Sequence, residues 1–193
     1  HDREECCSLS DFIAPESSGA RDWIGVFALS AGFGSDEIVK NYKADSNEYG
    51  AILTRAVCDR LTEAFSEYLH REVRERLWGY EAEGSISADD LLSGKYRGIR
   101  PAPGYPPCPN HSLKRHIWHI LDVEERTGIK LTETGAMWPV ASVSGFYFSH
   151  PGSKYFSVGK IGRDQLEDYA ARNGVSEEAA EKELEPVLGY NRD

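Results

Sequence analysis

The side chain with the clearest capacity for chemistry is Arg100, which lies in the proline-rich stretch Tyr96–Pro109 (YRGIRPAPGYPPCP). Five of the nine prolines fall in this stretch, and proline fixes φ and lacks a backbone donor. The stretch is therefore predicted to be a stiff, extended loop of polyproline type. A planar guanidinium on such a loop can grip a carboxylate or a phosphate.

Other groups near Arg100 suit a binding site. The peptide groups of Ala102 and Gly104 could form hydrogen bonds with a polar ring such as adenine. Tyr155 follows a predicted turn, where an aromatic ring can lie over a ligand. The simpler alternative is that Tyr155 and Phe156 alternate along a strand, with one ring in the core and the other outside.

A proline-rich linker between domains is the alternative interpretation of the loop. Its apolar and aromatic residues, Tyr96, Ile99 and Tyr105, suit packing better than solvation. The flanking segments are also strongly patterned. We therefore expect the loop to lie within a domain.

Metal binding is the next candidate chemistry, because Cys108, His111, His116 and His119 lie near one another in the sequence. Structural zinc sites prefer paired ligands two to four residues apart on each side, and this spacing does not provide them. His116 and His119 could meet on one helix face, but Trp118 between them fits a partly buried helix equally well. The pattern favours no metal site.

Self-contained catalysis has little support in the motifs. The sequence has no G-x-S-x-G elbow, no P-loop and no G-x-G-x-x-G after a strand. Asp59 and Glu63 are four residues apart on a predicted helix and could face a site, although such charges usually line a solvated face. The residues therefore predict a binding site rather than a complete active site.

The elements that must position these residues predict an α+β fold, in which a mostly antiparallel sheet is flanked by long helices. The strongest signal is a helix over 48–78 with one apolar face. A strand is expected over 22–30 and a β-hairpin over 141–161, with His150–Lys154 as its turn. Further helices are expected over 36–42, 111–126, 164–172 and 176–185.

Composition bounds the function. The chain has 193 residues, 40% of them hydrophobic, which is enough for one globular domain. Its net charge of −10 argues against nucleic-acid binding. No acidic residue lies between Asp90 and Asp122, so Arg100 sits in a basic island that would attract an anionic group.

Cellular location is inferred from what the sequence contains. Four scattered cysteines do not form a disulfide pattern, which favours a reducing compartment. No membrane-spanning stretch or signal peptide is visible, so we expect a cytoplasmic protein with no membrane contact.

Several long strings together closely resemble the C-terminal activation domain of cobalamin-dependent methionine synthase. The resemblance covers nearly the whole chain from Ser8, and RPAPGYP and SHPGSKYF are its most specific motifs. The matching strings are SLSDFIAP (8–15), DRLTEAFSEYLHREVRERLWGY (59–80), YRGIRPAPGYPPCPNH (96–111), TGIKLTETGAMWPVASVSGFYFSHPGSKYF (127–156), GRDQLEDYAARNGVS (162–176) and LGYN (188–191).

This resemblance implies a function. Methionine synthase transfers a methyl group from methyltetrahydrofolate to homocysteine through cobalamin. Its activation domain binds S-adenosylmethionine, docks over the cobalamin-binding domain, and supports remethylation of oxidised cobalamin with an electron from flavodoxin or a diflavin reductase. Zinc is expected only in the full-length enzyme, and the methyl-transfer groups lie in other modules.

The resemblance also implies site residues. Arg100 is expected to hold the ligand carboxylate, and Ala102 and Gly104 to contribute backbone contacts. Tyr155, with Phe156 beside it, is expected at the adenosyl or methionyl part. Glu63 matches a helix residue near that site, with weaker support.

The resemblance suggests a division of the chain. Residues 1–7 are expected to be disordered or introduced by cloning, and residues 8–193 to be the C-terminal portion of the activation domain. The family's N-terminal helical portion, which supplies an Asp to the ligand amino group, has no match here. Its absence is expected to leave apolar surface exposed.

Two alternatives remain open from the sequence. A stand-alone corrinoid-protein reactivator or sensor would retain the same fold. A metal-dependent hydrolase would use Cys108, His111 and His116.

Overall fold

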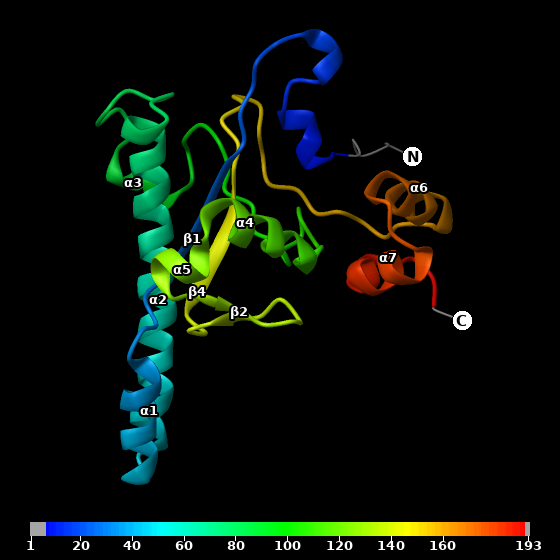
Figure 1. Ribbon diagram of the computed structural model, residues 1–193. Coiled ribbons are helices and arrows are strands. Elements are labelled where there is room, and N and C mark those ends of the chain that lie inside the picture. The colour runs from blue at the N-terminus through cyan, green and yellow to red at the C-terminus, as the bar shows by residue number, and fades with distance from the viewer. Residues whose placement is uncertain (1–6, 192–193) are drawn as a thin grey trace.

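Two antiparallel strands lie at the centre of the computed structural model, which describes residues 7–191 (Figure 1). Strand β1 (Gly25–Ser30) pairs with β4 (Ser142–Tyr147) in a register that places Gly25 opposite Tyr147 and Ser30 opposite Ser142. A smaller antiparallel pair is formed by β2 (Lys130–Leu131) and β3 (Met137–Trp138). The predicted antiparallel sheet and first strand are therefore confirmed.

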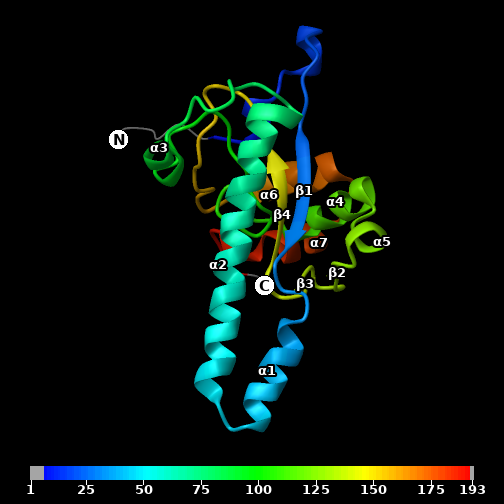
Figure 2. The same ribbon diagram turned by 90° about the vertical axis from the view of Figure 1, so that its left-hand side faces the viewer.

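Helices cover the central strands on both sides (Figure 2). On one side lies the long helix α2 (Glu48–Glu72), which continues as a π-helical turn over Val73–Leu77. On the other side lie α4 (Lys114–Leu121) and α5 (Val123–Thr127). Helix α1 (Ser35–Ala44) packs against the N-terminal half of α2, and the two project from the body as a helical hairpin. The predicted α+β class with long flanking helices is thus confirmed.

The core between the sheet and α2 is aromatic. Phe27 and Tyr147 face one another across the strands with ring centroids 4.6 Å apart. Leu29 and Val73 complete this buried cluster. Because these side chains lock the end of α2 onto β1 and β4, the polar residues just before Val73 hold a fixed position above the sheet.

The predicted hairpin over 141–161 is wrong in its second half. The turn forms, with Ser153 N–H donating to the His150 carbonyl at 3.0 Å, but no return strand pairs with β4. The reason is that the free edge of β4 is already occupied. Phe146 N–H donates to the Pro101 carbonyl at 2.9 Å, and Ile99 pairs with Phe148. The segment after the turn instead runs in extended form past the proline-rich loop.

The predicted helix over 111–126 is divided in two. Asp122 adopts a left-handed conformation (φ +48°), which a right-handed helix cannot contain, so α4 ends there and α5 starts anew. The glycine stop at Gly128 is confirmed, with φ +76°.

The large apolar side chains of α2 do not form the buried face that the sequence predicts. They are exposed, because smaller residues on the opposite side of the helix make the contacts with α1 and with the sheet. The exposed set is Tyr49, Ile52, Leu53, Val57, Leu61, Phe65 and Tyr68, and the buried set is Gly50, Ala51, Thr62, Ser66 and His70.

The C-terminal residues form a separate helical hairpin, α6 (Arg163–Asn173) and α7 (Glu177–Leu184), with its own buried cluster. Helix α3 (Ala88–Leu92) is a short surface helix. Short 3₁₀ turns occur at Leu9–Phe12, Glu16–Ser18, His111–Leu113 and Glu185–Val187. Within residues 7–191, no helix has the length and apolarity needed to cross a membrane.

Candidate functional site

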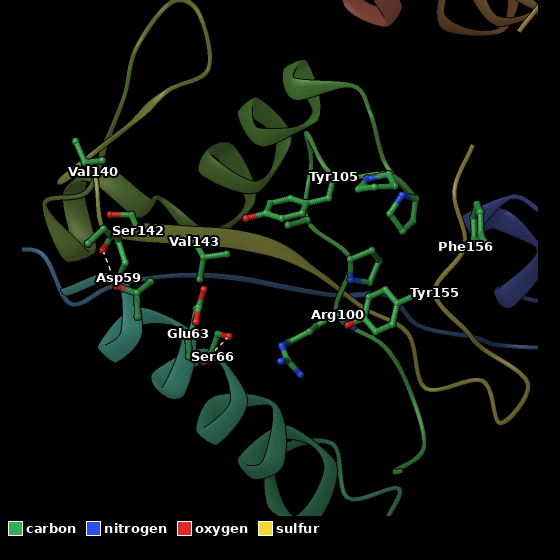
Figure 3. Close-up of a pocket in the computed structure, with 16 residues that line it drawn as sticks. Asp59, Glu63, Ser66, Arg100, Tyr105, Val140, Ser142, Val143, Tyr155 and Phe156 are labelled. Carbon is green, nitrogen blue, oxygen red and sulfur yellow. Dashed lines mark hydrogen bonds between the residues drawn. The ribbon is translucent and has the colours of Figure 1, made fainter. Parts of the chain in front are cut away.

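A pocket of about 680 Å³ opens between α2, the proline-rich loop, the start of β4 and the segment after the turn at His150 (Figure 3). This volume suits a small organic molecule. Its polar lining comes from α2 on one side and from Arg100 and Tyr155 on the other. The lining residues are Asp59, Thr62, Glu63, Ser66, Arg100, Pro101, Ala102, Tyr105, Pro106, Pro107, Val140, Ala141, Ser142, Val143, Tyr155 and Phe156.

The proline-rich loop is extended, as predicted, and it is fixed to the sheet edge. Ile99 exchanges two backbone hydrogen bonds with Phe148, at 3.1 and 3.0 Å, and the Pro101 carbonyl accepts from Phe146. Pro101 and Pro103 are fully buried. Because the backbone on both sides of Arg100 is held in this way, the origin of its side chain has little freedom.

Arg100 is held by Glu67, Tyr96 and Tyr155, and also by His70. Its Nη2 lies 2.6 Å from Glu67 Oε2, and its Nη1 donates to the Tyr96 hydroxyl at 2.6 Å. Its backbone N–H donates to the Tyr155 hydroxyl at 2.9 Å. The Arg100 side chain keeps about a fifth of its surface exposed (21%), and it lines the pocket. Nothing in the sequence pattern had marked Glu67 or Tyr96 as its partners.

Beneath Arg100 lies His70, which is fully buried. Its Nδ1 is 3.3 Å from Arg100 Nη1, and since a guanidinium can only donate, Nδ1 accepts. The ring proton is then on Nε2, which lies 3.4 Å from the Tyr80 hydroxyl. Burial, with the added effect of Arg74 and Arg100, lowers the pKa of His70 to about 2. His70 is therefore a neutral acceptor that supports the guanidinium.

A second arginine, Arg74, lies on the interior side of Arg100 and its partners and is fully buried. Its Nε donates to Glu81 Oε2 at 2.8 Å, and its Cζ lies 3.8 Å from the centre of the Tyr96 ring. Arg74 Nη1 is 3.9 Å from Glu67 Oε1. Two arginines and two glutamates thus balance their charges in one buried cluster, as burial of ions requires.

The peptide groups of the loop are partly engaged. The Ala102 carbonyl accepts from Tyr105 N–H at 3.2 Å, and Gly104 N–H donates to the Cys108 carbonyl at 2.7 Å. Among the described residues, Ala102 N–H and the Gly104 carbonyl have no partner in the protein. These two groups are the ones available to a ligand.

Gly104 lies outside the main pocket. It lines a neighbouring hollow of about 390 Å³, which shares Tyr105 and Pro106 with the main pocket. Its φ is +98°, and a Cβ at this position would overlap the His111 ring. His111 is itself held by Lys114, whose Nζ lies 3.0 Å from His111 Nδ1. The turn at Gly104 is therefore tied to the start of α4.

Tyr155 and Phe156 point to opposite sides of their extended segment (Figure 3). Tyr155 faces Arg100 and is 54% exposed. Phe156 also lines the pocket, but its ring packs 6.3 Å from that of Phe12. The alternation considered as the simpler reading is therefore present, although it arises in an extended segment rather than in a strand.

The acidic residues of α2 face the pocket at successive turns. Asp59 and Glu63 line it, and Glu67 follows four residues later against Arg100. Glu63 also pairs with Arg60, at 2.7 Å. The four-residue spacing that drew attention to Asp59 and Glu63 could have found Glu67 as well, because i, i+4 positions share one helix face.

The structure does not gather the histidines and Cys108 into a metal-binding group. Over residues 7–191, no three His, Cys, Asp or Glu side chains lie together in a way that could hold a metal ion. Cys108 is buried, and burial raises the pKa of its thiol to about 11. A thiol in this state is a poor metal ligand and a poor nucleophile.

The fold and the pocket are those of a mixed helix-and-strand domain built around a site of small-molecule size. The chain belongs to the family of vitamin B12-dependent methionine synthase activation domains, because the model of that family matches residues 1–174. The members of this family are domains of an enzyme, methionine synthase.

A solved structure supports the same assignment. The chain is 52% identical to the protein in the crystal structure of the MetH reactivation domain bound to AdoHcy, with a TM-score of 0.91. The match covers 95% of this chain and 56% of that chain. The chain therefore spans little more than half the length of the structure that it resembles.

Proposed function

We propose that this chain is the S-adenosylmethionine-binding part of a reactivation module in a cobalamin-dependent methionine synthase. The observation that carries this proposal is the placement of Arg100: a guanidinium on a fixed loop opens into a pocket of about 680 Å³ beside the Tyr155 ring. The solved relative holds AdoHcy, a close analogue of S-adenosylmethionine. Both molecules carry the carboxylate that a guanidinium recognises.

The ligand would lie along the loop. Its carboxylate would pair with Arg100, and the adenine would use the unpartnered Ala102 N–H and Gly104 carbonyl. Tyr155 would contact the adenosyl or methionyl part, with Phe156 supporting the segment from behind. The position of Gly104 in the adjoining hollow would direct the ligand across both pockets.

The acidic side of the pocket fits the rest of the ligand. S-adenosylmethionine carries a sulfonium and an ammonium in addition to its carboxylate. Asp59 and Glu63 face the pocket from α2, opposite the loop that carries Arg100 (Figure 3). Two carboxylates on that side would stabilise cationic groups of the ligand. This arrangement would orient the ligand by charge.

The remaining parts of the reaction lie outside this chain. Cobalamin, held by a neighbouring domain, supplies the methyl-transfer chemistry. The contribution of this chain is to bind and orient the sulfonium ligand, which is catalysis by positioning. Exposed Tyr105 and Val140 beside the pocket offer apolar surface to that docked domain. Flavodoxin or a diflavin reductase would supply the electron, zinc would belong to other modules, and the setting would be the cytoplasm.

Titration calorimetry with S-adenosylmethionine tests the proposal, on the wild type and on Arg100→Ala. Losing a charge-assisted pair should weaken binding at least about tenfold. Arg97→Ala is the matched control, because Arg97 lies in the same loop but its side chain donates to the Ser149 carbonyl. Equal losses in both variants, or no saturable binding by the wild type, would contradict the proposed site.

A further inference from the structure

Glu67 lies between two arginines and is fully paired with only one of them. Its Oε2 is 2.6 Å from Arg100 Nη2 and accepts from the Tyr96 hydroxyl at 3.1 Å. Its Oε1 is 3.9 Å from Arg74 Nη1, which is too long for a hydrogen bond. One oxygen of the carboxylate therefore faces the site and the other faces the interior.

The interior side of this arrangement is incompletely satisfied. Within the described part of the chain, Glu67 Oε1 and both Arg74 Nη atoms are buried and have no hydrogen-bond partner. Native proteins rarely leave buried charged groups in this condition, because each loses its hydration without replacement. An acceptor and two donors thus lie close to one another without a bond between them.

We propose that Glu67 is a positioning residue that exchanges its arginine partner when a carboxylate binds. In the structure Glu67 pairs with Arg100 and holds that side chain beside the pocket. When a ligand carboxylate pairs with Arg100, Glu67 turns inward and pairs with Arg74. This inference rests on the proposed function, because it requires that Arg100 receive a carboxylate.

The geometry needs only a small movement. Closing the Glu67–Arg74 distance to that of a normal charged hydrogen bond takes about 1 Å. Arg74 itself stays in place, because Glu81 holds its Nε and the Tyr96 ring lies against its guanidinium. The receiving partner is therefore preorganised, and the moving group is a single carboxylate at the end of a flexible side chain.

Charge balance supports the exchange. In the structure, Glu67 and Glu81 compensate the charges of Arg74 and Arg100. A ligand carboxylate that neutralises Arg100 would leave Glu67 without a cation unless it moves toward Arg74. The ligand carboxylate and Glu67 thus compete for Arg100. Arg74 lowers the free-energy cost of displacing Glu67, because it offers that carboxylate a second cation.

The test measures S-adenosylhomocysteine, which has the carboxylate, and 5′-methylthioadenosine, which lacks it, by calorimetry on wild type and Glu67→Gln. If Glu67 competes, the variant should bind S-adenosylhomocysteine about three- to tenfold more tightly, since one charged partner of Arg100 is gone. Affinity for 5′-methylthioadenosine should stay within about twofold. A merely structural role would weaken both ligands.

Two further variants isolate the exchange. Glu81→Gln makes the same chemical change in the same cluster, but Glu81 does not contact Arg100, so carboxylate affinity should not rise. Arg74→Lys keeps the charge and removes the guanidinium fork, so it should weaken S-adenosylhomocysteine about threefold or more. When Arg74→Lys is made in the Glu67→Gln background, the affinity for S-adenosylhomocysteine should change little, because residue 67 then has no carboxylate that must move.

The outcomes separate the two proposals. If the wild type binds both ligands and Glu67→Gln weakens the affinity for both equally, the exchange is overturned and the proposed function still stands. Wild-type protein that binds neither ligand overturns the proposed function, and the exchange with it. Tighter binding of S-adenosylhomocysteine alone, together with a coupled effect of Arg74→Lys, establishes the exchange.

Discussion

Helix α2 has two faces that contrast sharply. Its inner face, defined by Thr62, Ser66 and His70, is buried against the sheet and the Arg100 cluster, although its residues are small or polar. Its outer face, defined by Leu53, Val57, Leu61, Phe65 and Tyr68, carries large apolar side chains and is exposed.

The contrast shows that a helix face can be buried through small and polar side chains although the opposite face is more apolar. Small side chains allow the helix backbone to approach closely, and the Thr62 hydroxyl donates to the Ala141 carbonyl at 3.0 Å. The polar residues of the inner face then reach the pocket and Arg100. The outer face adds nothing to the site, and an exposed apolar surface of this kind is typical of contact regions.

The strongest test of the contrast is Arg74→Ala, which removes the cation at the base of the inner face. Two partly buried carboxylates, Glu67 and Glu81, would lose a compensating charge. We expect a loss of about 3–5 kcal/mol in the free energy of unfolding, measured by urea denaturation. Arg60→Ala, which removes one partner of an ion pair on the same helix whose two side chains are both exposed, should cost less than about 1 kcal/mol. Similar losses would show that the inner cluster has no special role in stability.

Neighbouring residues on α2 give the next test, because Phe65 is on the outer face and Ser66 on the inner face. Ser66→Leu overpacks the contact with the sheet and should cost about 1–3 kcal/mol of unfolding free energy. Phe65→Ser should change it by about 0.5 kcal/mol or less. Binding of a fluorescent apolar dye should fall in Phe65→Ser and not in Ser66→Leu. The reverse order of stabilities would mean that the outer face is covered in solution.

The smallest effect is expected from pH. Burial and the two arginines lower the pKa of His70 to about 2, far below its ordinary value of 6.5. Between these values the unfolded chain binds a proton that the folded chain does not, so His70 reduces stability as pH falls below about 6.5. From pH 7.5 to 5.5, the wild type should lose about 1 kcal/mol more unfolding free energy than His70→Gln. Parallel curves for the two proteins would exclude a buried neutral histidine.

The sequence predicted the parts of the fold that depend on local rules. Proline content fixed the extended loop, and long apolar periodicity predicted α2, because both are properties of neighbouring residues. The prediction from sequence failed where segments distant in the chain compete for the same sheet edge. The return strand after the turn at His150 is absent because residues 99–101 already occupy the edge of β4.

For the candidate site, too, the sequence predicted some residues that meet in the pocket and missed others. Arg100, Ala102, Tyr155 and Phe156 come together in the pocket, whereas Gly104 lies in the adjoining hollow. Glu67 was missed as a partner of Arg100 because it is 33 residues away and reaches it only once α2 lies beside the loop. No spacing rule connects such a pair before the helix is placed in three dimensions.

The contact between Gly104 and His111 restricts how this loop can change over generations. A side chain at Gly104 meets two obstacles, its positive φ and the His111 ring, whereas a smaller residue at His111 meets neither. Substitution at His111 would remove the overlap, but it would also remove the ring nitrogen that lies 3.0 Å from Nζ of the buried Lys114. A change at Gly104 would remain strained even after His111 had been replaced, because its φ would still be positive.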